Sequence, residues 1–459
     1  MPKSGILFLF LLIFVLPSAK AQISISSPYS RYAFGELTSS GFAGYSGMGY
    51  ANIAMSDSTL INIGNPASFA FFIPHRPLFD FGASGIFTKA STSEASSNFS
   101  AMGLRNIALG IPINERFGFS LGVVPFSSVG YELSTTTNEA GIGDVTYNFN
   151  GSGGLNKIYL GFAGRAINTK KHQLAFGITG NYLFGNITRS RTAYYPSYTG
   201  IKHTKVVNHT IVSDFLFESG VYDRIALPVN EKVKRDSSIV PVRRFLSFGA
   251  TYTLGNEISA RQDMLAYTFK NAYEILLDTV AYTDTTSGYL SFPEKIGFGV
   301  AYEWHIGRTG NDFTRVQLSV QGELQNWSRY AEVFGNSVVE DQLKNARNFA
   351  LGMSITPLAT NKIEKGKFHR IMTYRLGLRY ADTYLNLYDT QIKQYGISFG
   401  LGIPLVQTFS FSQLNVGFEF GKRGTTENNL LQENYLAFQV GFTIMPHKYD
   451  GWFYKRKYD

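Results

Sequence analysis

Five arginines lie in segments where apolar and polar residues alternate, each on the polar side. These are Arg105, Arg165, Arg315, Arg375 and Arg379. A guanidinium group can hold a carboxylate through two parallel hydrogen bonds. If the segments are strands around a common interior, the arginines are candidate contacts for an acidic ligand. The alternative is that they pair with Glu303, Glu323 and Glu419 across that interior, or with a segment that fills it.

The sequence indicates no catalytic or metal site. The seven histidines are scattered and none has the spacing of a metal-ligand motif. His203 and His209 lie near Ser213 and Asp214, but nothing in the sequence aligns them as a catalytic constellation. Glycine-rich stretches that resemble nucleotide loops are not followed by a helix. We therefore expect no catalytic residues, no metal and no cofactor.

The composition excludes several protein classes. Among 459 residues there is no cysteine, so disulfides, thiolate metal sites and a lipid-modified cysteine are ruled out. Charged residues make up only 16%, whereas Gly (46), Phe (38) and Tyr (28) are plentiful. This composition suits neither a soluble helical enzyme nor a disordered chain. The net charge of +9 is spread along the chain, so we expect no nucleic-acid partner.

Residues 1–21 are typical of a secretory signal peptide. Lys3 supplies the positive start, Ile6–Leu16 is an unbroken apolar run, and Ala19-Lys20-Ala21 is a cleavage site. The apolar run is too short to cross a bilayer as a helix. An uncleaved N-terminal anchor is the alternative. No later segment approaches 18 consecutive apolar residues.

Alternation with a period of two is the main signal in the rest of the chain. It is clear in Ile296–His305, Phe313–Gln325 and Tyr435–Ile444, where apolar residues alternate with small or polar ones. A soluble β-sandwich would bury the apolar face, whereas a transmembrane barrel turns it toward lipid and lines its lumen with the small and polar face. Strand length favours the barrel, because a tilted membrane crossing needs about ten residues.

Two further features favour the barrel. Short turns such as 113–116 and 168–171 alternate along the chain with long polar loops, which are predicted at 133–154, 189–208, 257–290, 329–344 and 422–434. Bacterial barrels have short periplasmic turns and long outer loops. Aromatic residues also gather at strand ends, where an interfacial girdle is expected. The residues predicted for this girdle are Tyr302, Trp304, Trp327, Tyr330, Tyr380 and Tyr384.

The predicted fold is all-β, a transmembrane antiparallel β-barrel of about fourteen strands with an N-terminal luminal hatch. The strands are predicted at 78–89, 99–112, 116–132, 155–167, 172–188, 208–224, 243–256, 290–306, 313–328, 345–357, 369–383, 391–404, 408–421 and 434–445. Residues 22–77 lack sustained alternation and suit a segment that fills the lumen, and the barrel spans 78–445. Residues 446–459 form a basic-aromatic tail, either solvated or a docking peptide for a periplasmic partner.

Pro125 interrupts a predicted crossing strand. Proline has no N–H to give a neighbouring strand, so it favours a kink or bulge. We interpret Gly122, Pro125 and Gly130 as the mark of a lateral opening in the wall. The alternative is that Pro125 lies at the outer end of a shortened strand.

Three stretches resemble the FadL/TodX-type family of outer-membrane transporters for hydrophobic compounds. The stretches are 47–51 with the Asn65-Pro66-Ala67-Ser68 motif, 292–300 with 323–328, and 374–380 with 396–404. The opening Ser27-Pro28-Tyr29-Ser30-Arg31-Tyr32 resembles a branch of such barrels in Bacteroidetes-type bacteria. The resemblance implies a barrel of about fourteen strands, a luminal hatch and export of the ligand sideways into the membrane. It also implies that Asn65, Pro66 and Ala67 gate the passage near the kink; an ordinary loop turn is the alternative.

The functional expectation is therefore passive, hatch-gated passage of a hydrophobic, fatty-acid-like molecule across the outer membrane of a Gram-negative bacterium. The alternative is a barrel that serves as a structural or secretion-associated platform for proteins. Expected partners are outer-membrane lipid and lipopolysaccharide, the hydrophobic ligand and, through the C-terminal tail, a periplasmic or secretion-system protein. An enzyme is not expected.

Overall fold

The computed structural model describes residues 27–446 apart from 229–231, 236–237, 271–273, 308–312, 336, 340–342, 360–367 and 406–411. The predicted signal peptide and nearly all of the C-terminal tail lie outside the described residues. No helix among the described residues is long and apolar enough to span a membrane.

The wall is a closed antiparallel barrel of fourteen strands, as predicted. Each strand pairs with the next, and β2 also pairs with β20, which closes the ring. The wall strands are β2 (Leu78–Ser91), β3 (Ser96–Pro112), β4 (Phe117–Glu139), β5 (Gly143–Asn168), β6 (His172–Tyr194), β7 (His203–Leu227), β9 (Ser238–Thr253), β12 (Lys295–Gly307), β13 (Phe313–Gln325), β16 (Ala346–Ala359), β17 (Thr373–Leu387), β18 (Thr390–Pro404), β19 (Gln413–Gly424) and β20 (Gln432–Ile444).

Exposure along β13 shows which face meets lipid. The apolar side chains Leu318, Val320 and Leu324 are 37%, 52% and 51% exposed, whereas the polar side chains that alternate with them, Gln317, Ser319 and Gln321, are buried. A soluble sandwich would bury the apolar side. Because the polar side faces the filled interior instead, the apolar side forms a lipid-facing belt, and the predicted transmembrane barrel is confirmed.

The hatch, residues 27–77, fills the lumen. Its elements are η1 (Pro28–Arg31), β1 (Glu36–Leu37), α2 (Ala43–Ser46) and η2 (Pro66–Phe71). Glycines on the inner face of the wall let the hatch approach closely. A Cβ at Gly400 would lie 2.9 Å from the Gly47 backbone, and one at Gly377 would lie 2.2 Å from Gly49. Gln321 also accepts hydrogen bonds from the Asn52 and Ile53 amides, at 2.7 and 2.9 Å.

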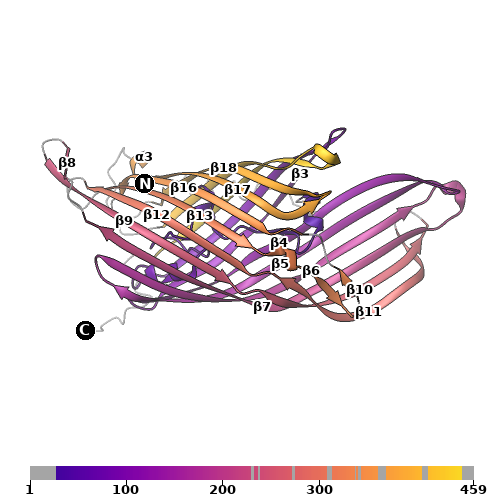
Figure 1. The fold of residues 1–459 in the computed structure, drawn as a ribbon, viewed down its shortest axis with the longest axis horizontal. Coiled ribbons are helices and arrows are strands. Elements are labelled where there is room, and N and C mark those ends of the chain that lie inside the picture. Colours follow the sequence, from indigo (N-terminus) through magenta and orange to yellow (C-terminus); the bar gives the residue numbers. More distant parts are fainter. Residues whose placement is uncertain are drawn as a thin grey trace, which may run out of the picture.

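Four of the five predicted outer loops are wrong in extent, because much of them is strand; the fifth, 422–434, lies between the end of β19 at Gly424 and the start of β20 at Gln432. β4 to β7 continue far beyond the predicted boundaries, and in Figure 1 they reach further to the right than the other wall strands. The predicted loop 257–290 is a hairpin of β10 (Asn256–Phe269) and β11 (Leu276–Phe292), which pairs with the outer half of β7. The predicted loop 329–344 contains β14 (Glu332–Phe334) and β15 (Ser337–Val339). We call the sheet formed by the outer parts of β4, β5, β6 and β7 with β10 and β11 the rim sheet.

Two predicted short turns are confirmed, one before β4 and one after β5. β3 ends at Pro112 and β4 begins at Phe117, while β5 ends at Asn168 and β6 begins at His172. On the same end of the barrel, β8 (Lys232–Arg235) pairs with the start of β9. The remaining short elements are η3 (Ser197–Thr199), η4 (Trp327–Arg329), α3 (Phe368–Ile371) and η5 (Glu427–Asn429).

Candidate functional site

The wall is interrupted between β3 and β4. Their pairing runs from Pro112↔Gly118 to Ile107↔Val123 and then stops. Beyond this point β3 pairs only with β2, and no described residue pairs with its other side between Ser96 and Asn106. Met102 and Leu104 are 64% and 56% exposed there. An unpaired strand edge at this height is unusual, because lipid offers no hydrogen bonds to the backbone.

The hatch takes the place of β3 along β4. In β1, Glu36 pairs with Ser128 and Leu37 with Ser127. The Thr38 amide then donates to the Phe126 carbonyl at 2.9 Å. The wall strand β4 is thus bound on one side by β5 and on the other by the hatch.

Pro125, Gly122 and Gly130 lie along this departure. Gly122 pairs with Ala108 just before the interruption. The β4–β5 register shifts between Pro125 and Ser127, which marks a bulge. Gly130 accepts from the Ser27 amide at 3.1 Å and donates to Ser30 Oγ at 3.0 Å. The geometry thus puts all three residues beside the gap, and their role in an opening stays a prediction.

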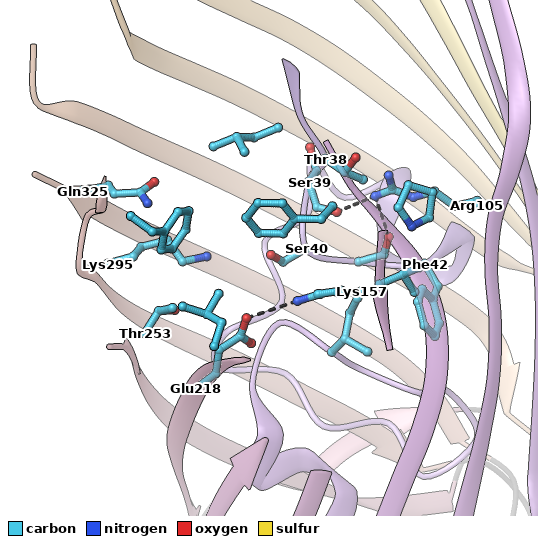
Figure 2. A pocket seen from close by; sticks show the side chains of 18 residues that line it. Thr38, Ser39, Ser40, Phe42, Arg105, Lys157, Glu218, Thr253, Lys295 and Gln325 are labelled. Carbon is cyan, nitrogen blue, oxygen red and sulfur yellow. Dashed lines mark hydrogen bonds and ion pairs between the residues drawn. The ribbon is translucent and has the colours of Figure 1, made fainter. Parts of the chain in front are cut away.

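A small cavity of about 70 Å³ lies beside the gap, between hatch and wall (Figure 2). Its apolar lining includes Leu37, Phe42, Phe126, Leu216 and Phe292. Its polar lining includes Ser39, Arg105, Lys157, Glu218 and Lys295. Its lining is more apolar than polar, and a mainly apolar lining with a few placed polar groups is typical of small-molecule sites.

The charges around the cavity are not equally satisfied. Lys157 Nζ lies 3.1 Å from Glu218, and Lys295 Nζ lies 3.7 Å from Glu323. Arg105 instead donates to the backbone carbonyls of Ser39 and Gly41, the latter at 3.1 Å. Its side chain is buried, 8% exposed, and no carboxylate of the described residues pairs with it. Arg105 is therefore a buried cation at the cavity whose charge is not neutralised by a described neighbour.

A bulge explains how Arg105 reaches this position. The β2–β3 register runs from Gly82↔Asn106 to Ala83↔Leu104, so Arg105 has no residue opposite it on β2. The extra residue re-aims its side chain, as bulges next to functional sites often do. Figure 2 shows Arg105 pointing at Ser39, with Lys157 and Glu218 facing each other across the cavity.

Two of the other candidate arginines are held by carboxylates. Arg379 donates to Glu419 at 2.7 Å and to Ser39 Oγ at 3.1 Å. Arg315 donates to Asp57 of the hatch at 2.9 Å. Burial alone would raise the pKa of Asp57, but Arg315 and the hydrogen bonds from Thr59 lower that pKa below its usual range.

The remaining two arginines lie away from the cavity beside the gap. Arg375 donates to Asn415 Oδ1 at 3.0 Å. Arg165 donates to Asn168 at 3.0 Å and to the Glu115 carbonyl, and its guanidinium lies 5.1 Å from the ring centre of Phe71. The structure thus brings only Arg105 of the five to this cavity.

Asn65 and Pro66 lie against β6 and β7. Asn65 Nδ2 donates to the carbonyls of Ile53 and Val221 at 2.8 and 2.9 Å, and Asn65 Oδ1 accepts from the Ala67 amide at 3.0 Å, which caps η2. The wall allows this approach because Gly177 and Gly220 carry no Cβ. The hatch residues at the cavity beside Pro125 are 37–42 and Ile63 instead. The gating role of Asn65, Pro66 and Ala67 stays a prediction.

An aromatic cluster closes the outer half of the lumen. Phe34 of the hatch is fully buried. Its ring centre lies 5.6–6.4 Å from those of Phe126, Phe292, Trp327 and Tyr330. The ring centres of Phe126 and Phe292 are 5.5 Å apart. Arg189 donates to the Ala33 carbonyl at 2.5 Å, and the Tyr384 hydroxyl donates to the Gly35 carbonyl at 2.6 Å. These two bonds hold the turn that carries Phe34.

The aromatic cluster corrects part of the predicted girdle. Trp327, Tyr330 and Tyr384 are 0%, 3% and 9% exposed, so they lie inside the barrel and do not face lipid. Trp327 stacks on Tyr384 with ring centres 4.4 Å apart. Sequence reasoning did not single out Phe34. The only signal in the sequence was the glycine that follows it, Gly35. In the structure Gly35 has a φ of +87°, which glycine adopts readily at a tight turn.

The described residues hold no group of three or more His, Asp or Glu side chains that could bind a metal ion. The arrangement beside the gap can bind a ligand. It combines an apolar cavity, one buried guanidinium and a gap in the wall beside them.

The model of the BamG family matches residues 1–459. The chain belongs to the BamG family. No curated protein matches it. The fold of this BamG-family chain is similar to that of three solved structures. A Pseudomonas aeruginosa FadL homologue is 10% identical, with 90% of this chain and 99% of that chain covered and a TM-score of 0.52.

The Ralstonia pickettii toluene transporter TbuX is 12% identical, with 93% and 100% covered and a TM-score of 0.50. The Pseudomonas putida toluene transporter TodX is 14% identical, with 90% and 99% covered and a TM-score of 0.50. At these identities the likeness concerns the fold. The FadL/TodX-type resemblance stated from the sequence is thus confirmed for this BamG-family chain at that level.

Proposed function

We propose that this chain is an outer-membrane channel for the passive passage of hydrophobic small molecules, with exit sideways between β3 and β4. The observation that carries the proposal is the end of β3–β4 pairing at Ile107↔Val123, directly beside a largely apolar cavity. A gap at the height of the lipid-facing belt gives an apolar molecule a route into the membrane that avoids water. The solved structures of similar fold include toluene transporters, which supports the proposal.

The ligand that we propose is amphipathic and fatty-acid-like. Its apolar part would lie against Phe42, Phe126 and Phe292, and its acidic head would meet Arg105. Hydrogen bonds to a charged group are worth about 1.5–3 kcal/mol, so one guanidinium can decide between an acid and a neutral hydrocarbon. Arg379 and Arg315 do not serve this purpose, because Glu419 and Asp57 already hold them.

A disulfide that locks β1 to β4 tests the route. Paired antiparallel residues have Cα atoms about 4.5–5.5 Å apart, within the range that a disulfide needs. The chain has no cysteine of its own, so Leu37→Cys with Ser127→Cys creates a single reversible bond. We expect the oxidised variant to lose uptake of labelled oleate into cells that carry it in their outer membrane, and to regain uptake after reduction.

The matched control joins Ser91→Cys to Ser96→Cys, a paired position at the outer end of β2 and β3. This bond should leave uptake unchanged. Equal uptake by the oxidised and reduced Leu37/Ser127 variant would contradict the sideways route. If cells that carry the unmodified protein take up no more oleate or toluene than cells without it, the proposal that the protein lets hydrophobic molecules pass is wrong.

The second candidate function is a platform for other proteins. The rim sheet favours it, because this sheet extends beyond the lipid-facing wall and contributes little to the cavity. Wild-type protein without uptake, but with a stoichiometric protein partner in native mass spectrometry, would support the platform.

A further inference from the structure

The rim sheet ends in an open strand. Its order is β4, β5, β6, β7, β10 and β11, and β11 is its last strand. In Figure 1 the β10–β11 hairpin lies on the far side of the extended region from β4. Nothing in the proposed passage of ligand uses this edge.

β11 is exposed on both of its faces. Its ten consecutive residues Leu276–Thr285 are all exposed, whereas its partner β10 is partly buried along its length. On the side away from β10, β14 pairs with Gly288–Leu290 and then stops. No described residue pairs with that side of β11 from Leu276 to Ser287. A run of unpaired N–H and C=O groups therefore faces solvent, and such a run is a template for a further strand.

The composition of the free edge of β11 favours binding to another strand. Leu276, Leu277, Val280 and Tyr282 are 48%, 48%, 62% and 62% exposed. No lysine and no proline lies between Leu276 and Ser287, although natural edge strands commonly use both to prevent pairing. Exposed apolar groups gathered at one place outside the lipid-facing belt indicate an interaction surface.

The free edge of β11 carries negative charge. Asp278 and Asp284 are its only ionisable carboxylates, and neither forms an ion pair with a described residue. A second copy of this chain that paired edge to edge would bring two acidic strands together, which is unfavourable. An added strand with basic side chains would instead be attracted.

We propose that the free edge of β11 binds an extended segment of a partner protein in which apolar and basic residues alternate. The segment would add to the rim sheet as a further antiparallel strand, in the mode of β-augmentation. The chain itself already uses this edge once, because β14 is a strand added to β11 at Gly288–Leu290. The partner segment would continue outward from β14 along the same edge.

The test uses synthetic peptides and the full chain purified in detergent. One peptide alternates valine with lysine and the other alternates valine with glutamate, both as long as the free edge. We expect the lysine peptide to bind with an affinity that falls as salt is raised, and to slow hydrogen exchange at residues 276–287 without slowing it in β13. The glutamate peptide should bind at least tenfold more weakly.

Two variants make the result specific. Asp278→Lys with Asp284→Lys should reverse the preference, so that the glutamate peptide binds and the lysine peptide does not. Val280 lies in a bulge, opposite no residue of β10, so Val280→Pro should fold and lose peptide binding because it blocks strand addition. A Val338→Pro variant, on β15 outside this edge, is the control and should bind normally.

Several outcomes would overturn the proposal. These are equal binding of both peptides, no binding of the lysine peptide, binding unchanged in the Val280→Pro variant, or protection confined to residues outside β11. A concentration-dependent dimer that both peptides fail to disrupt would show that the edge belongs to a contact between copies instead.

Discussion

Leu37 of the hatch pairs with Ser127 of the wall, three residues after Phe34 enters the aromatic cluster. The short segment Phe34–Leu37 therefore touches both the closed outer half of the lumen and the edge of the gap. Arg423 strengthens this connection, because it binds Glu36 at 2.9 Å and also Glu433. A ligand that displaces Phe34 would pull on the strand that covers the gap.

Phe34→Ala should loosen the outer closure. Loss of a fully buried phenylalanine typically costs about 3–5 kcal/mol, here from the packing of the hatch against Trp327 and Tyr330. We expect higher ion conductance in planar bilayers and faster oleate uptake, with the barrel intact by heat-modifiable gel mobility. Phe87→Ala is the control, since Phe87 is 47% exposed on the lipid side. Unchanged conductance would show that Phe34 does not close the lumen.

Arg105→Gln should discriminate between ligand classes. Loss of one charge-assisted contact predicts oleate uptake lower by about tenfold to a hundredfold, with toluene uptake unchanged. Arg105→Lys should recover part of the oleate uptake, because the positive charge remains. Arg165→Gln removes the same charge far from the cavity and should have little effect. An equal loss for oleate and toluene would mean that Arg105 only holds the hatch through Ser39 and Gly41.

Asn65→Ala should release the hatch from β7. The variant loses the bonds to Ile53, Val221 and Ala67, and unsatisfied buried backbone groups cost about 1–3 kcal/mol. Faster hydrogen exchange is expected in residues 60–71, with wall strands unchanged. Asn98→Ala, on the exposed part of β3, should exchange like the wild type. Wild-type protection in the Asn65→Ala variant would remove Asn65 as an anchor.

The ion pair between Asp57 and Arg315 predicts how the hatch responds to acid. Since the pKa of Asp57 is lower in the folded protein than in the unfolded chain, the pair stabilises the hatch at neutral pH and loses this contribution as pH falls through the lowered value. The protection of residues 52–62 against hydrogen exchange, relative to the unfolded chain at the same pH, should stay constant from neutral pH to about pH 4, near the ordinary value for aspartate, and fall below it. Asp57→Asn should abolish this acid-dependent step. A step that persists in that variant must come from another group.

The sequence predicted the wall well because each wall strand separates two environments. Leu318, Val320 and Leu324 meet lipid while Ser319 faces the interior, so the alternation of apolar and polar residues can be recognised in the sequence. The rim sheet gave no such signal. β11 is exposed to solvent on both faces. Its Thr and Asp residues therefore resemble a polar loop until their pairing with β10 is known.

The site was predictable only in part. Pro125 and Arg105 were identifiable, because a proline within a strand and a polar residue on the interior face are local features. The partners of the arginines were predicted only as alternatives: Glu419, one of those named, does pair with Arg379, and the lumen-filling segment supplies Asp57, a residue the sequence did not single out. Arg315 meets Asp57 at a separation of 258 residues, and no spacing rule gives such a contact. Nor could an aromatic residue at a strand end be assigned to lipid or lumen, which is why Trp327 and Tyr384 were placed wrongly.

The ring of the barrel closes where β2 meets β20, the first and the last wall strands in the chain. The hatch leads directly into β2, so the segment that fills the lumen is tethered at this seam. Along the seam a continuous ladder from Phe79↔Ile444 to Ser91↔Gln432 separates the hatch from lipid. Connectivity therefore anchors the internal segment to the place where the first and the last wall strands hold each other.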